Sequence, residues 1–386
     1  MARHKADQEL DPEDDPGSAL DPSVEGAPAP SVSHSELAKI VRKVGKTVGG
    51  DEELIALYDS DNVRFRIPYW IGTGAPDLDQ KLGGGLAGGR VIEVFSRSES
   101  EGKSSFAASV AACCQRQGGV VVWFDSENTV LPEYFKDFGL DIENLIFAFC
   151  PTLESFFEVV EAFSKEFRQA NADAPLLFVL DSVAAAQTAS QEASDYDKPG
   201  VAAQARVISA ALRKLTGILS VTQATLLLVN QSRTNIGVMF GDDNETPGGR
   251  AMKFYATQRV ALRRAGKVTS DGTKDGKLIG IDVEAHIVKN KVAPPFKKSK
   301  FRLLFGRGVL YHSSAFDLLF RRGIISGGAA GRYTHVPTGE TLYKKDFPSF
   351  LKAHPEVGFD IERQTALMDP EDMVAAVEPE ITEETE

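Results

Sequence analysis

The sequence predicts an α/β protein whose core is a doubly wound, mostly parallel sheet. From Val91 onward, short runs of β-branched and aromatic residues alternate with longer amphipathic stretches, which is the order of a βαβ series. The short runs are almost continuously apolar, as expected for strands covered on both faces. The chain has 386 residues, enough for two or three folding units. No run reaches the ~18 consecutive apolar residues of a membrane helix, so we expect no membrane-spanning segment.

The expected elements follow in chain order. A helix is predicted at residues 35–48, where Leu37, Ile40, Val41 and Val44 recur at helical spacing. The expected core strands are residues 91–95, 120–125, 145–149, 176–181 and 225–230. The expected core helices are residues 104–117, 153–168 with Thr152 as N-cap, and 203–219.

Beyond the core, three further runs have strand character, and a small α+β unit follows them. The runs are residues 259–264, 283–288 and 301–304, and the small unit holds an amphipathic segment at 315–322 and a turn at Gly327-Gly328. We therefore divide the chain into an acidic tail at 1–33, an N-terminal oligomerisation segment at 34–71, a core at 72–307, a small C-terminal domain at 308–360 and a second acidic tail at 361–386.

Charge is distributed unevenly along the chain. The net charge is −12, but residues 1–33 and 366–386 each contain eight acidic residues, so the body between them is slightly basic. Segments that carry charges of mainly one sign and few aromatic residues are typical of disordered chains. Either a solubility role or an autoinhibitory role fits them. The N-terminus lacks the pattern of a signal peptide and the chain has only three cysteines, which favours the reducing cytoplasm.

Residues 97–104, Arg-Ser-Glu-Ser-Glu-Gly-Lys-Ser, stand between the first core strand and a helix. A phosphate-binding loop needs this context, because backbone N–H groups at the helix N-terminus cradle phosphates while Lys103 reaches the β and γ oxygens. The Ser104 hydroxyl is the expected Mg²⁺ ligand. The first glycine of the usual pattern is missing, and an ordinary helix start remains the alternative for this motif alone.

Three other strands also end in polar residues. Asp181 follows an apolar strand and is placed to hold Mg²⁺ through water, with turn chemistry as the alternative. Glu127 follows another and is placed to activate the attacking water. The run Asn230-Gln231 ends a third and offers an amide to the γ-phosphate. Four polar strand ends at one edge favour a nucleotide site over four unrelated turns.

These motifs, taken together and in order, resemble those of the RecA-family homologous recombinases over residues 72–306. The resemblance is carried by Gly-Thr-Gly-Ala-Pro-Asp-Leu-Asp at 72–79, Gly-Lys-Ser at 102–104, Phe-Asp-Ser-Glu at 124–127 and Leu-Asp-Ser-Val-Ala-Ala at 180–185. It continues through Asn-Gln-Ser-Arg at 230–233, Ile-Gly-Val-Met-Phe-Gly at 236–241, Gly248-Gly249, Lys-Phe-Tyr-Ala at 253–256 and Val-Lys-Asn-Lys-Val-Ala-Pro-Pro-Phe-Lys at 288–297.

The resemblance implies a RecA-like ATPase core that binds ATP and Mg²⁺. It makes Glu127 the catalytic glutamate, Gln231 the link between the γ-phosphate and DNA, and Tyr134 the ring that stacks on adenine. Lys289 and Lys291 would reach the ATP of a neighbouring subunit in a helical filament, whereas a solvated strand edge is the ordinary reading of such a pair. The implied nucleotide-binding residues are Ser98, Glu99, Ser100, Glu101, Gly102, Lys103, Ser104, Ser105, Tyr134 and Asp181, with Ser104 and Asp181 at the metal.

Two segments resemble the family's DNA-binding loops, residues 190–200 and 232–250. A mobile surface loop is the alternative, but exposed Ile, Val, Met and Phe side chains in one loop favour a nucleic-acid partner. The implied DNA-binding residues are Lys198, Arg206, Arg213, Arg233, Ile236, Met239, Phe240, Gly248, Gly249 and Arg250.

The expected function is ATP-dependent strand exchange between single-stranded DNA and a homologous duplex, with DNA-stimulated ATP hydrolysis. The phosphate loop departs from the family pattern: it is one residue longer, and Ser96 or Arg97 is expected to make the turn of the missing glycine. This departure leaves open an ATP-gated, non-hydrolysing protein that coats single-stranded DNA. A ring-forming ATPase motor with the same fold is a further alternative, against which the two DNA-loop matches argue.

Overall fold

The structure is a computed structural model, which describes residues 33–49, 66–170, 173–193, 201–234 and 244–366. The chain divides into two compact units, Met1–Phe65 and Arg66–Glu386, and each is described by itself. The second unit therefore begins six residues earlier than the core that the sequence predicts. These residues pack with the core because Tyr69 donates a hydrogen bond to the Gln223 carbonyl and Trp70 pairs with Ala87.

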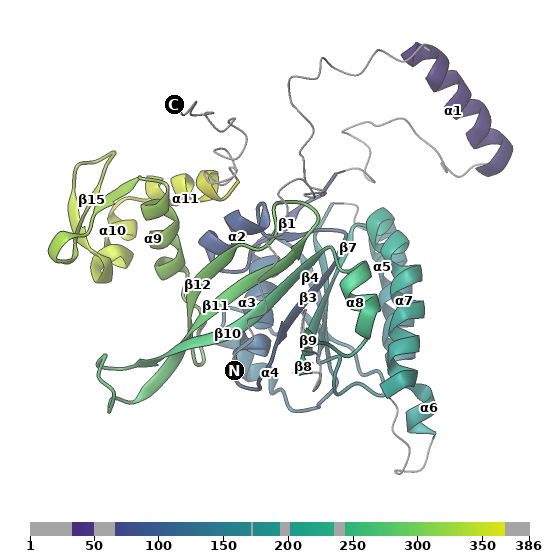
Figure 1. Cartoon of the computed structure of the whole chain (residues 1–386), viewed down its shortest axis with the longest axis horizontal. Coiled ribbons are helices and arrows are strands. Elements are labelled where there is room, and N and C mark those ends of the chain that lie inside the picture. Colours follow the sequence, from purple (N-terminus) through teal and green to yellow (C-terminus); the bar gives the residue numbers. More distant parts are fainter. Residues whose placement is uncertain (1–32, 50–65, 171–172, 194–200, 235–243, 367–386) are drawn as a thin grey trace, which may run out of the picture. The chain divides into compact units, whose positions relative to one another are not determined.

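The first unit contains one described helix, α1 (His34–Gly49) (Figure 1). Ser33 and Glu36 start it with a capping box: the Glu36 N–H donates to Ser33 Oγ at 3.3 Å, and the Ser33 N–H donates to Glu36 Oε2 at 3.0 Å. On its apolar side, Ile40 and Val44 remain 51% and 41% exposed. Within its own unit, the helix thus presents an exposed apolar stripe.

The second unit is built on a nine-stranded sheet of order β13-β12-β11-β10-β3-β7-β6-β4-β5. The six strands from β10 to β5 run parallel, whereas β10 to β13 are antiparallel neighbours. The doubly wound, mostly parallel sheet is confirmed. The strands are β3 (Val91–Ser96), β4 (Val120–Asp125), β5 (Leu145–Phe147), β6 (Leu176–Asp181), β7 (Ala224–Gln231), β10 (Gln258–Thr269), β11 (Leu278–Asn290), β12 (Lys298–Leu304) and β13 (Gly308–Val309).

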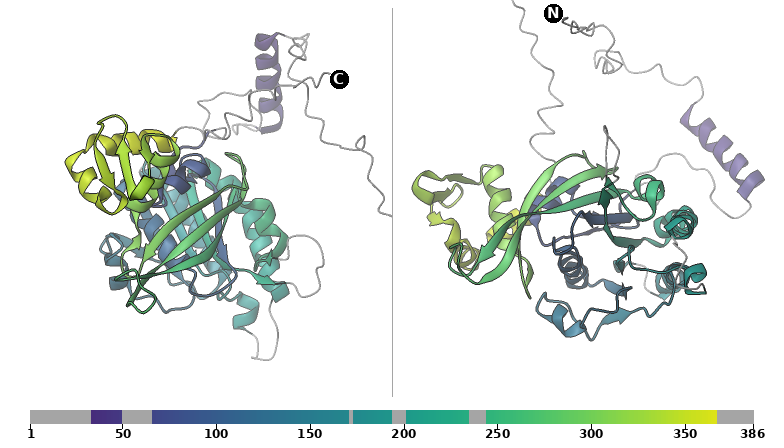
Figure 2. Two further views of the ribbon diagram at one scale, coloured as in Figure 1. Left: turned by 60° about the vertical axis from the view of Figure 1, so that its left-hand side comes forward. Right: turned by 60° about the horizontal axis from the view of Figure 1, so that its bottom comes forward.

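Helices cover both faces of this sheet (Figures 1 and 2). Because side chains alternate along β3, Ile92 and Val94 join one core with α3, while Val91 joins the other core with α5 and α7. The helices of this unit are α2 (Pro76–Leu82), α3 (Lys103–Arg116), α4 (Pro132–Lys136), α5 (Leu153–Ala170), α6 (Ala189–Glu192), α7 (Val201–Thr222) and α8 (Gly249–Tyr255). Two short pairs accompany them, β1 (Trp70–Ile71) with β2 (Leu86–Ala87) and β8 (Arg233–Thr234) with β9 (Asn244–Glu245).

Strands β10 and β11 form a hairpin that is longer than the sequence predicts. They have 12 and 13 residues, whereas apolar runs predict six residues in each. The extra length lies in residues 265–282, where exposed polar side chains and four glycines give no strand pattern. The hairpin carries this part of the sheet well beyond its parallel strands (Figure 1).

The C-terminal part has its own apolar core, which includes Phe316, Leu319 and Phe350. Arg321 joins it to α2 through a 2.9 Å ion pair with the buried Asp77. The last helix continues to Ala366 with Ile361 fully buried, so residues 361–366 belong to this part and not to an acidic tail. The elements are α9 (Tyr311–Arg321), β14 (Ile325–Gly327), β15 (Arg332–His335), β16 (Thr341–Tyr343), α10 (Phe347–Ala353) and α11 (Glu356–Ala366), with short 3₁₀ turns at Ala329–Gly331 and Lys344–Asp346.

Candidate nucleotide site and nucleic-acid interface

The phosphate loop connects β3 to α3. Gly102 immediately precedes the helix with φ +87°, a conformation that favours glycine, and an added Cβ would meet Leu303 Cδ1 at 3.0 Å. No side chain of the described residues caps this helix N-terminus. Its first backbone N–H groups are therefore available to an anion, and they fit the phosphates of a nucleotide.

Lys103 is half-buried in this loop. Its Nζ donates to Ser96 Oγ at 2.8 Å and to the Ser98 carbonyl at 3.2 Å. Burial lowers the pKa of the ammonium group, while Asp181 and Glu101 oppose that shift. The ammonium thus lies against oxygens of Ser96 and Ser98, beside the start of α3. Ser98, Glu99 and Ser100 are exposed, and Glu101 and Ser105 are partly buried.

The expected turn at Ser96 or Arg97 is wrong. Among the described residues of this loop, the non-glycine residue with a left-handed backbone is Ser100, at φ 54°, and neither Ser96 nor Arg97 has a positive φ. The left-handed turn of this loop therefore lies at an exposed serine, where it costs about 1 kcal/mol.

Asp181 ends β6 beside the phosphate loop. Its carboxyl is only 6% exposed, and burial raises its pKa to about 6, although a hydrogen bond from Ser104 and the charge of Lys103 oppose the shift. The nearby carboxylates Glu127 and Asp125 raise the pKa further. A divalent cation stabilises the ionised form of such a buried carboxyl, and the oxygens of Ser104 and Asp181 are of the type that Mg²⁺ prefers.

Glu127 is held by two neighbouring side chains. The Ser182 hydroxyl donates to Glu127 Oε1 at 3.1 Å, and Asp125 Oδ1 accepts from the Glu127 N–H at 3.0 Å. Asp125 Oδ2 also accepts from the Thr129 and Val130 N–H groups, each at 2.8 Å. Asp125 therefore shapes the turn after β4, and Ser182 orients the carboxylate. The sequence did not single out Ser182 for this task.

Gln231 ends β7 opposite Ser96 of β3. Its N–H donates to Asn230 Oδ1 at 3.0 Å, and the following Ser232 N–H donates to the Ser96 carbonyl at 2.9 Å. Gln231 thus lies at the start of the phosphate loop. The preceding Asn230 is fully buried and faces the interior, so Gln231 is the residue of this run whose side chain can offer an amide.

Tyr134 of α4 is 47% exposed and packs edge-on against Phe138, with ring centroids 5.3 Å apart. Its hydroxyl accepts a hydrogen bond from the Gly306 N–H at 3.3 Å. Gly306 lies three residues beyond Leu303, the residue that an added Cβ at Gly102 would meet. The ring is therefore exposed near the phosphate loop.

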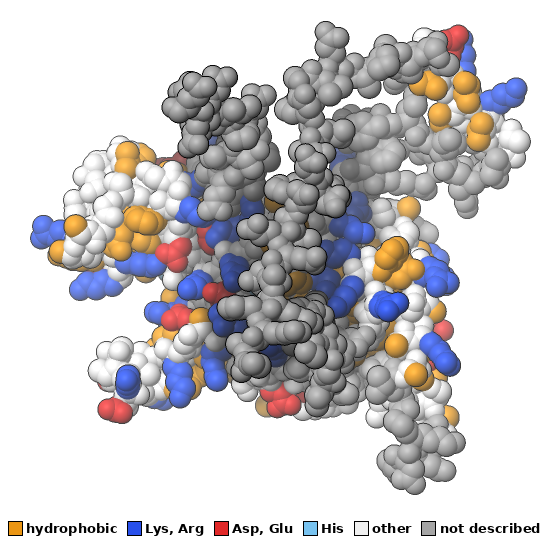
Figure 3. All heavy atoms as spheres, viewed as in Figure 1, with side chains coloured by type: hydrophobic (Ala, Val, Ile, Leu, Met, Phe, Trp, Pro, Cys, Tyr) orange, Lys and Arg blue, Asp and Glu red, His pale blue; other side chains and the backbone are white. Residues whose placement is uncertain are grey.

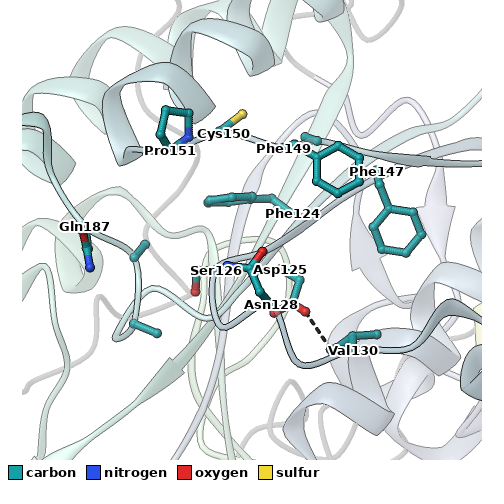
Figure 4. Close-up of a pocket in the computed structure, with 13 residues that line it drawn as sticks. Phe124, Asp125, Ser126, Asn128, Val130, Phe147, Phe149, Cys150, Pro151 and Gln187 are labelled. Atoms are coloured by element: carbon teal, nitrogen blue, oxygen red, sulfur yellow. Dashed lines mark hydrogen bonds between the residues drawn. The ribbon is translucent and has the colours of Figure 1, made fainter. Parts of the chain in front are cut away.

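A hollow of about 680 Å³ lies beside the Asp125 turn (Figure 4). Phe124, Phe147 and Phe149 surround it, and Phe149 is 88% exposed. In Figure 4 the dashed line marks the hydrogen bond that Asp125 accepts from Val130. None of the residues expected to bind the nucleotide lines this hollow.

Lys289 and Lys291 lie at the opposite end of the parallel strands. The Lys291 N–H donates to the Thr257 carbonyl, and the Thr257 N–H donates to the Val91 carbonyl, so Lys291 neighbours the start of β3. The phosphate loop follows the end of β3, five residues and ~17 Å away. Burial, followed by the positive charges of Lys291 and Arg259, lowers the pKa of Lys289 to about 8. The lysine pair is thus not assembled with the phosphate loop of its own chain.

Five of the expected DNA-binding residues line a groove of about 460 Å³ between α7 and the start of α8: Arg206, Arg213, Gly248, Gly249 and Arg250. The three arginines are exposed, and none makes an ion pair with a described residue. The sequence expectation brought these residues together from two segments, and the groove assembles them. Arg233 lies in β8, whereas Lys198, Ile236, Met239 and Phe240 lie outside the described residues.

A second basic surface lies on the antiparallel strands. Figure 3 shows lysine and arginine side chains gathered over this region of the molecule. The exposed basic residues on one face of these strands are Arg263, Lys298 and Lys300, and Glu284 forms ion pairs with Arg263 and Lys300. Arg264 and Lys267 lie opposite Val283 and Ile281, on the other face.

Three buried polar residues, Arg259, Glu93 and Asn230, form a row of contacts that the sequence did not predict, and we call it the buried polar row. Arg259 of β10 pairs with Glu93 of β3 at 2.5 Å, and both side chains are at most 5% exposed. Asn230 Nδ2 donates to Glu93 Oε1 at 2.9 Å. The available signal was a charged residue within each apolar strand run, but only the strand register joins the two.

An uncapped Gly-Lys-Ser helix start beside carboxylates at the carboxyl ends of a parallel sheet defines a nucleotide-binding ATPase of the phosphate-loop class. The family model of the RecA N-terminal domain matches residues 35–310. Protein RecA of Rubrobacter xylanophilus is 38% identical over 76% of this chain and 82% of its own. Protein RecA of Thioalkalivibrio sulfidiphilus is 36% identical over 79% of this chain and 85% of its own. Protein RecA of Caldanaerobacter subterraneus subsp. tengcongensis is 34% identical over 85% of this chain and 90% of its own. The chain belongs to the RecA family.

Membership of this family establishes the general activity. The protein binds nucleotide, is a DNA-dependent ATPase and acts as a recombinase in DNA recombination and repair. Among the described residues, no helix has the length and apolar character needed to cross a membrane.

Proposed function

We propose that the protein binds Mg²⁺ and ATP at the carboxyl edge of its parallel sheet, assembles as a helical filament on single-stranded DNA, and promotes strand exchange with a homologous duplex. One observation carries this proposal. The phosphate-loop residues and the lysine pair Lys289 and Lys291 lie at opposite ends of the strands. One subunit therefore cannot bring all of them to one nucleotide, whereas a head-to-tail assembly can.

The carboxyl edge supplies the groups that phosphoryl transfer requires. Lys103 and the N–H groups at the start of α3 bind phosphate oxygens, and Ser104 and Asp181 hold the metal. Bound Mg²⁺ supplies neutralisation of the charge that develops on the phosphates. Glu127, oriented by Ser182, takes the proton of the attacking water, and Gln231 contacts the γ-phosphate. Tyr134 contributes its exposed ring to the adenine.

The amino edge supplies Lys289 and Lys291 to the nucleotide of the next subunit. Two cations that arrive only on assembly stabilise transition-state charge only in the filament, which makes hydrolysis depend on DNA. The exposed apolar stripe of α1, with Ile40 and Val44, suits a contact with a second copy of the chain.

The groove lined by Arg206, Arg213 and Arg250 suits the backbone of single-stranded DNA, because its exposed guanidinium groups have no competing carboxylates among the described residues. Lys198, Arg233, Ile236, Met239 and Phe240 are proposed to complete this interface. The basic surface on β10 and β12 suits the duplex partner. The proposed compartment is the cytoplasm, where DNA and ATP occur together and the three free cysteines stay reduced.

The first experiment measures ATP hydrolysis with and without single-stranded DNA in Mg²⁺, with Lys103→Ala as the inactive variant. We expect strong stimulation by DNA, lost in the variant. ATP-dependent DNA binding without hydrolysis would instead indicate a coating protein. Closed hexamers without helical filaments in electron micrographs would indicate a ring-forming motor.

A mixing experiment tests the trans arrangement directly. Lys103→Ala and Lys289→Ala are each expected to be inactive alone. In a random mixture, about a quarter of the subunit contacts join an intact Lys103 to an intact Lys289, and a similar share of the wild-type rate should return. No recovery in mixed filaments would place Lys289 in the function of its own subunit.

A further inference from the structure

The ammonium group of Lys289 is held within its own subunit. Its Nζ donates to the Lys253 carbonyl at 2.6 Å and to the Phe254 carbonyl at 3.0 Å. These carbonyls belong to the last turn of α8, where a helix carries partial negative charge and attracts cations. A lysine that acts on a neighbour's nucleotide must first leave these carbonyls.

The first turn of α8 forms part of the wall of the groove proposed to bind DNA. Gly248 and Gly249 precede and open the helix with φ angles of +92° and +53°, and both line the groove together with Arg250. An added Cβ at Gly248 would meet Met252 Cγ at 3.0 Å and Ile208 Cγ2 at 3.1 Å. The groove wall and the helix that holds Lys289 are therefore one short continuous segment.

The buried polar row ties both ends of this segment to the sheet. Asn230 Nδ2 donates to the Pro247 carbonyl at 3.0 Å, just before α8, and to Glu93 Oε1 at 2.9 Å. Glu93 Oε2 accepts from Arg259 Nε at 2.5 Å, and Arg259 is the register partner of Lys289. Pro247 is thus hydrogen-bonded to the rigid sheet and directly precedes α8. A displacement at Pro247 is therefore transmitted to α8.

Stability does not explain this row, because apolar residues of similar size often replace a buried ion pair without loss. Its geometry gives it a different use. It connects the carboxyl edge, at Asn230 and Gln231, with the amino edge, at Lys289. These two edges must act together in the proposed filament.

We propose that α8 is a latch on Lys289: without DNA its last carbonyls hold the ammonium group, and DNA bound in the groove turns α8 about Gly248 and Gly249 and frees that group for the neighbouring subunit. The latch rests on the proposed function, since it assumes that the groove takes DNA and that Lys289 acts in trans. It deepens that function by giving DNA stimulation a structural cause. Asn230, Glu93 and Arg259 are then positioning residues.

Limited acylation of amines in the full chain, followed by mass spectrometry, measures how accessible the Lys289 amine is. The measurement does not depend on catalysis. Ala251→Gly weakens α8 about five-fold, because glycine disfavours a helix interior relative to alanine. We expect Lys289 labelling to rise by up to about five-fold, with the exposed Lys136 of α4 unchanged as internal reference. Ala162→Gly, at an exposed site within α5, is the matched control and should leave Lys289 labelling as in the wild type. Equal labelling of Lys289 in all three proteins would overturn the latch.

The release step is tested on the wild type with Mg²⁺, ATP and a saturating single-stranded oligonucleotide that is too short to hold two subunits, so that no neighbouring subunit can cover Lys289. We expect Lys289 labelling to rise once fluorescence anisotropy reports binding. If the oligonucleotide binds and the labelling of Lys289 stays constant, the latch fails while the DNA function stands. If the oligonucleotide does not bind under any nucleotide condition, the proposed function fails and the latch fails with it.

Discussion

The two edges of the parallel sheet carry different halves of the chemistry. At the carboxyl edge, Lys103, Asp181 and Glu127 follow three strands of one sheet and interact electrostatically with one another. At the amino edge, Lys289 and Lys291 have no phosphate loop of their own chain within reach. The carboxyl edge can bind a nucleotide in one subunit, whereas the amino edge acquires a role only on assembly.

This difference separates binding from turnover. A change at the carboxyl edge that removes only the proton acceptor, Glu127, should leave nucleotide binding intact. Changes at the amino edge should affect only the assembled protein. Each edge also carries a group with a shifted pKa: the Asp181 carboxyl resists ionisation and the Lys289 amine resists protonation, and burial is the main cause of both shifts.

The largest effect is expected for Glu127→Gln. Losing the proton acceptor should lower kcat by about 10²–10⁴-fold, while ATP-dependent DNA binding is kept because the phosphate and metal groups are untouched. Steady-state hydrolysis and DNA anisotropy measure the two properties. Glu133→Gln, an exposed site on α4, is the control. Wild-type turnover in Glu127→Gln would remove this residue from catalysis.

Lys289→Ala sharpens the comparison from the other edge. We expect the DNA-stimulated rate to fall by about 10³-fold, as when a trans-acting cation is removed. ATP affinity of dilute, unassembled subunits should stay unchanged, in contrast to Lys103→Ala. Lys165→Ala, at an exposed site on α5, serves as control. A loss of ATP affinity in dilute Lys289→Ala would contradict the separation of the edges.

Asp181→Asn tests the strain stored at the carboxyl edge. The folded-state pKa is about 6, above the ~3.9 of an unfolded chain, so the folded protein holds this proton more tightly. Stability from this group is fully present below pH ~4 and is lost as pH rises to ~6. Without Mg²⁺ at pH 7.5, Asp181→Asn should therefore raise the free energy of unfolding by about 1–3 kcal/mol. With Mg²⁺ and ATP present, the same substitution should abolish hydrolysis, because it removes a proposed metal ligand. Near pH 4 the stabilisation should vanish. Denaturant unfolding at both pH values decides the matter, and equal stability at pH 7.5 would refute the strain.

Local patterns explain why the carboxyl edge was predictable from the sequence. Asp181 and Gln231 each follow an apolar run, and the ends of parallel strands meet at one edge, so neither assignment needed a distant contact. The lysine pair was assigned by family resemblance alone, because a Lys-x-Lys at a strand end has no local signature. The Glu93–Arg259 pair depends on the register of strands that are 166 residues apart in the chain.

The hairpin of β10 and β11 and the end of α11 were missed for a similar reason. Residues 265–282 are largely exposed, so no apolar alternation marks them as strands. In α11, Val357 and Ile361 are buried against the C-terminal core, but two apolar residues before an acidic tail predict little by themselves. Tertiary packing decided both elements.

The smallest expected effect concerns the departure of the phosphate loop from the family pattern. Ser100 has a left-handed backbone, which costs a non-glycine residue about 1 kcal/mol, so Ser100→Gly should remove that strain. Glycine also gives the unfolded chain more freedom, which offsets the gain by about 0.5–1 kcal/mol. The matched control is Ser98→Gly, since Ser98 is exposed in the same loop without a positive φ and suffers only the second effect. We expect Ser100→Gly to be more stable than Ser98→Gly by about 1 kcal/mol in denaturant unfolding. Equal stabilities of the two variants would mean that the longer loop carries no strain, and that its departure from the family pattern is neutral for the folded subunit.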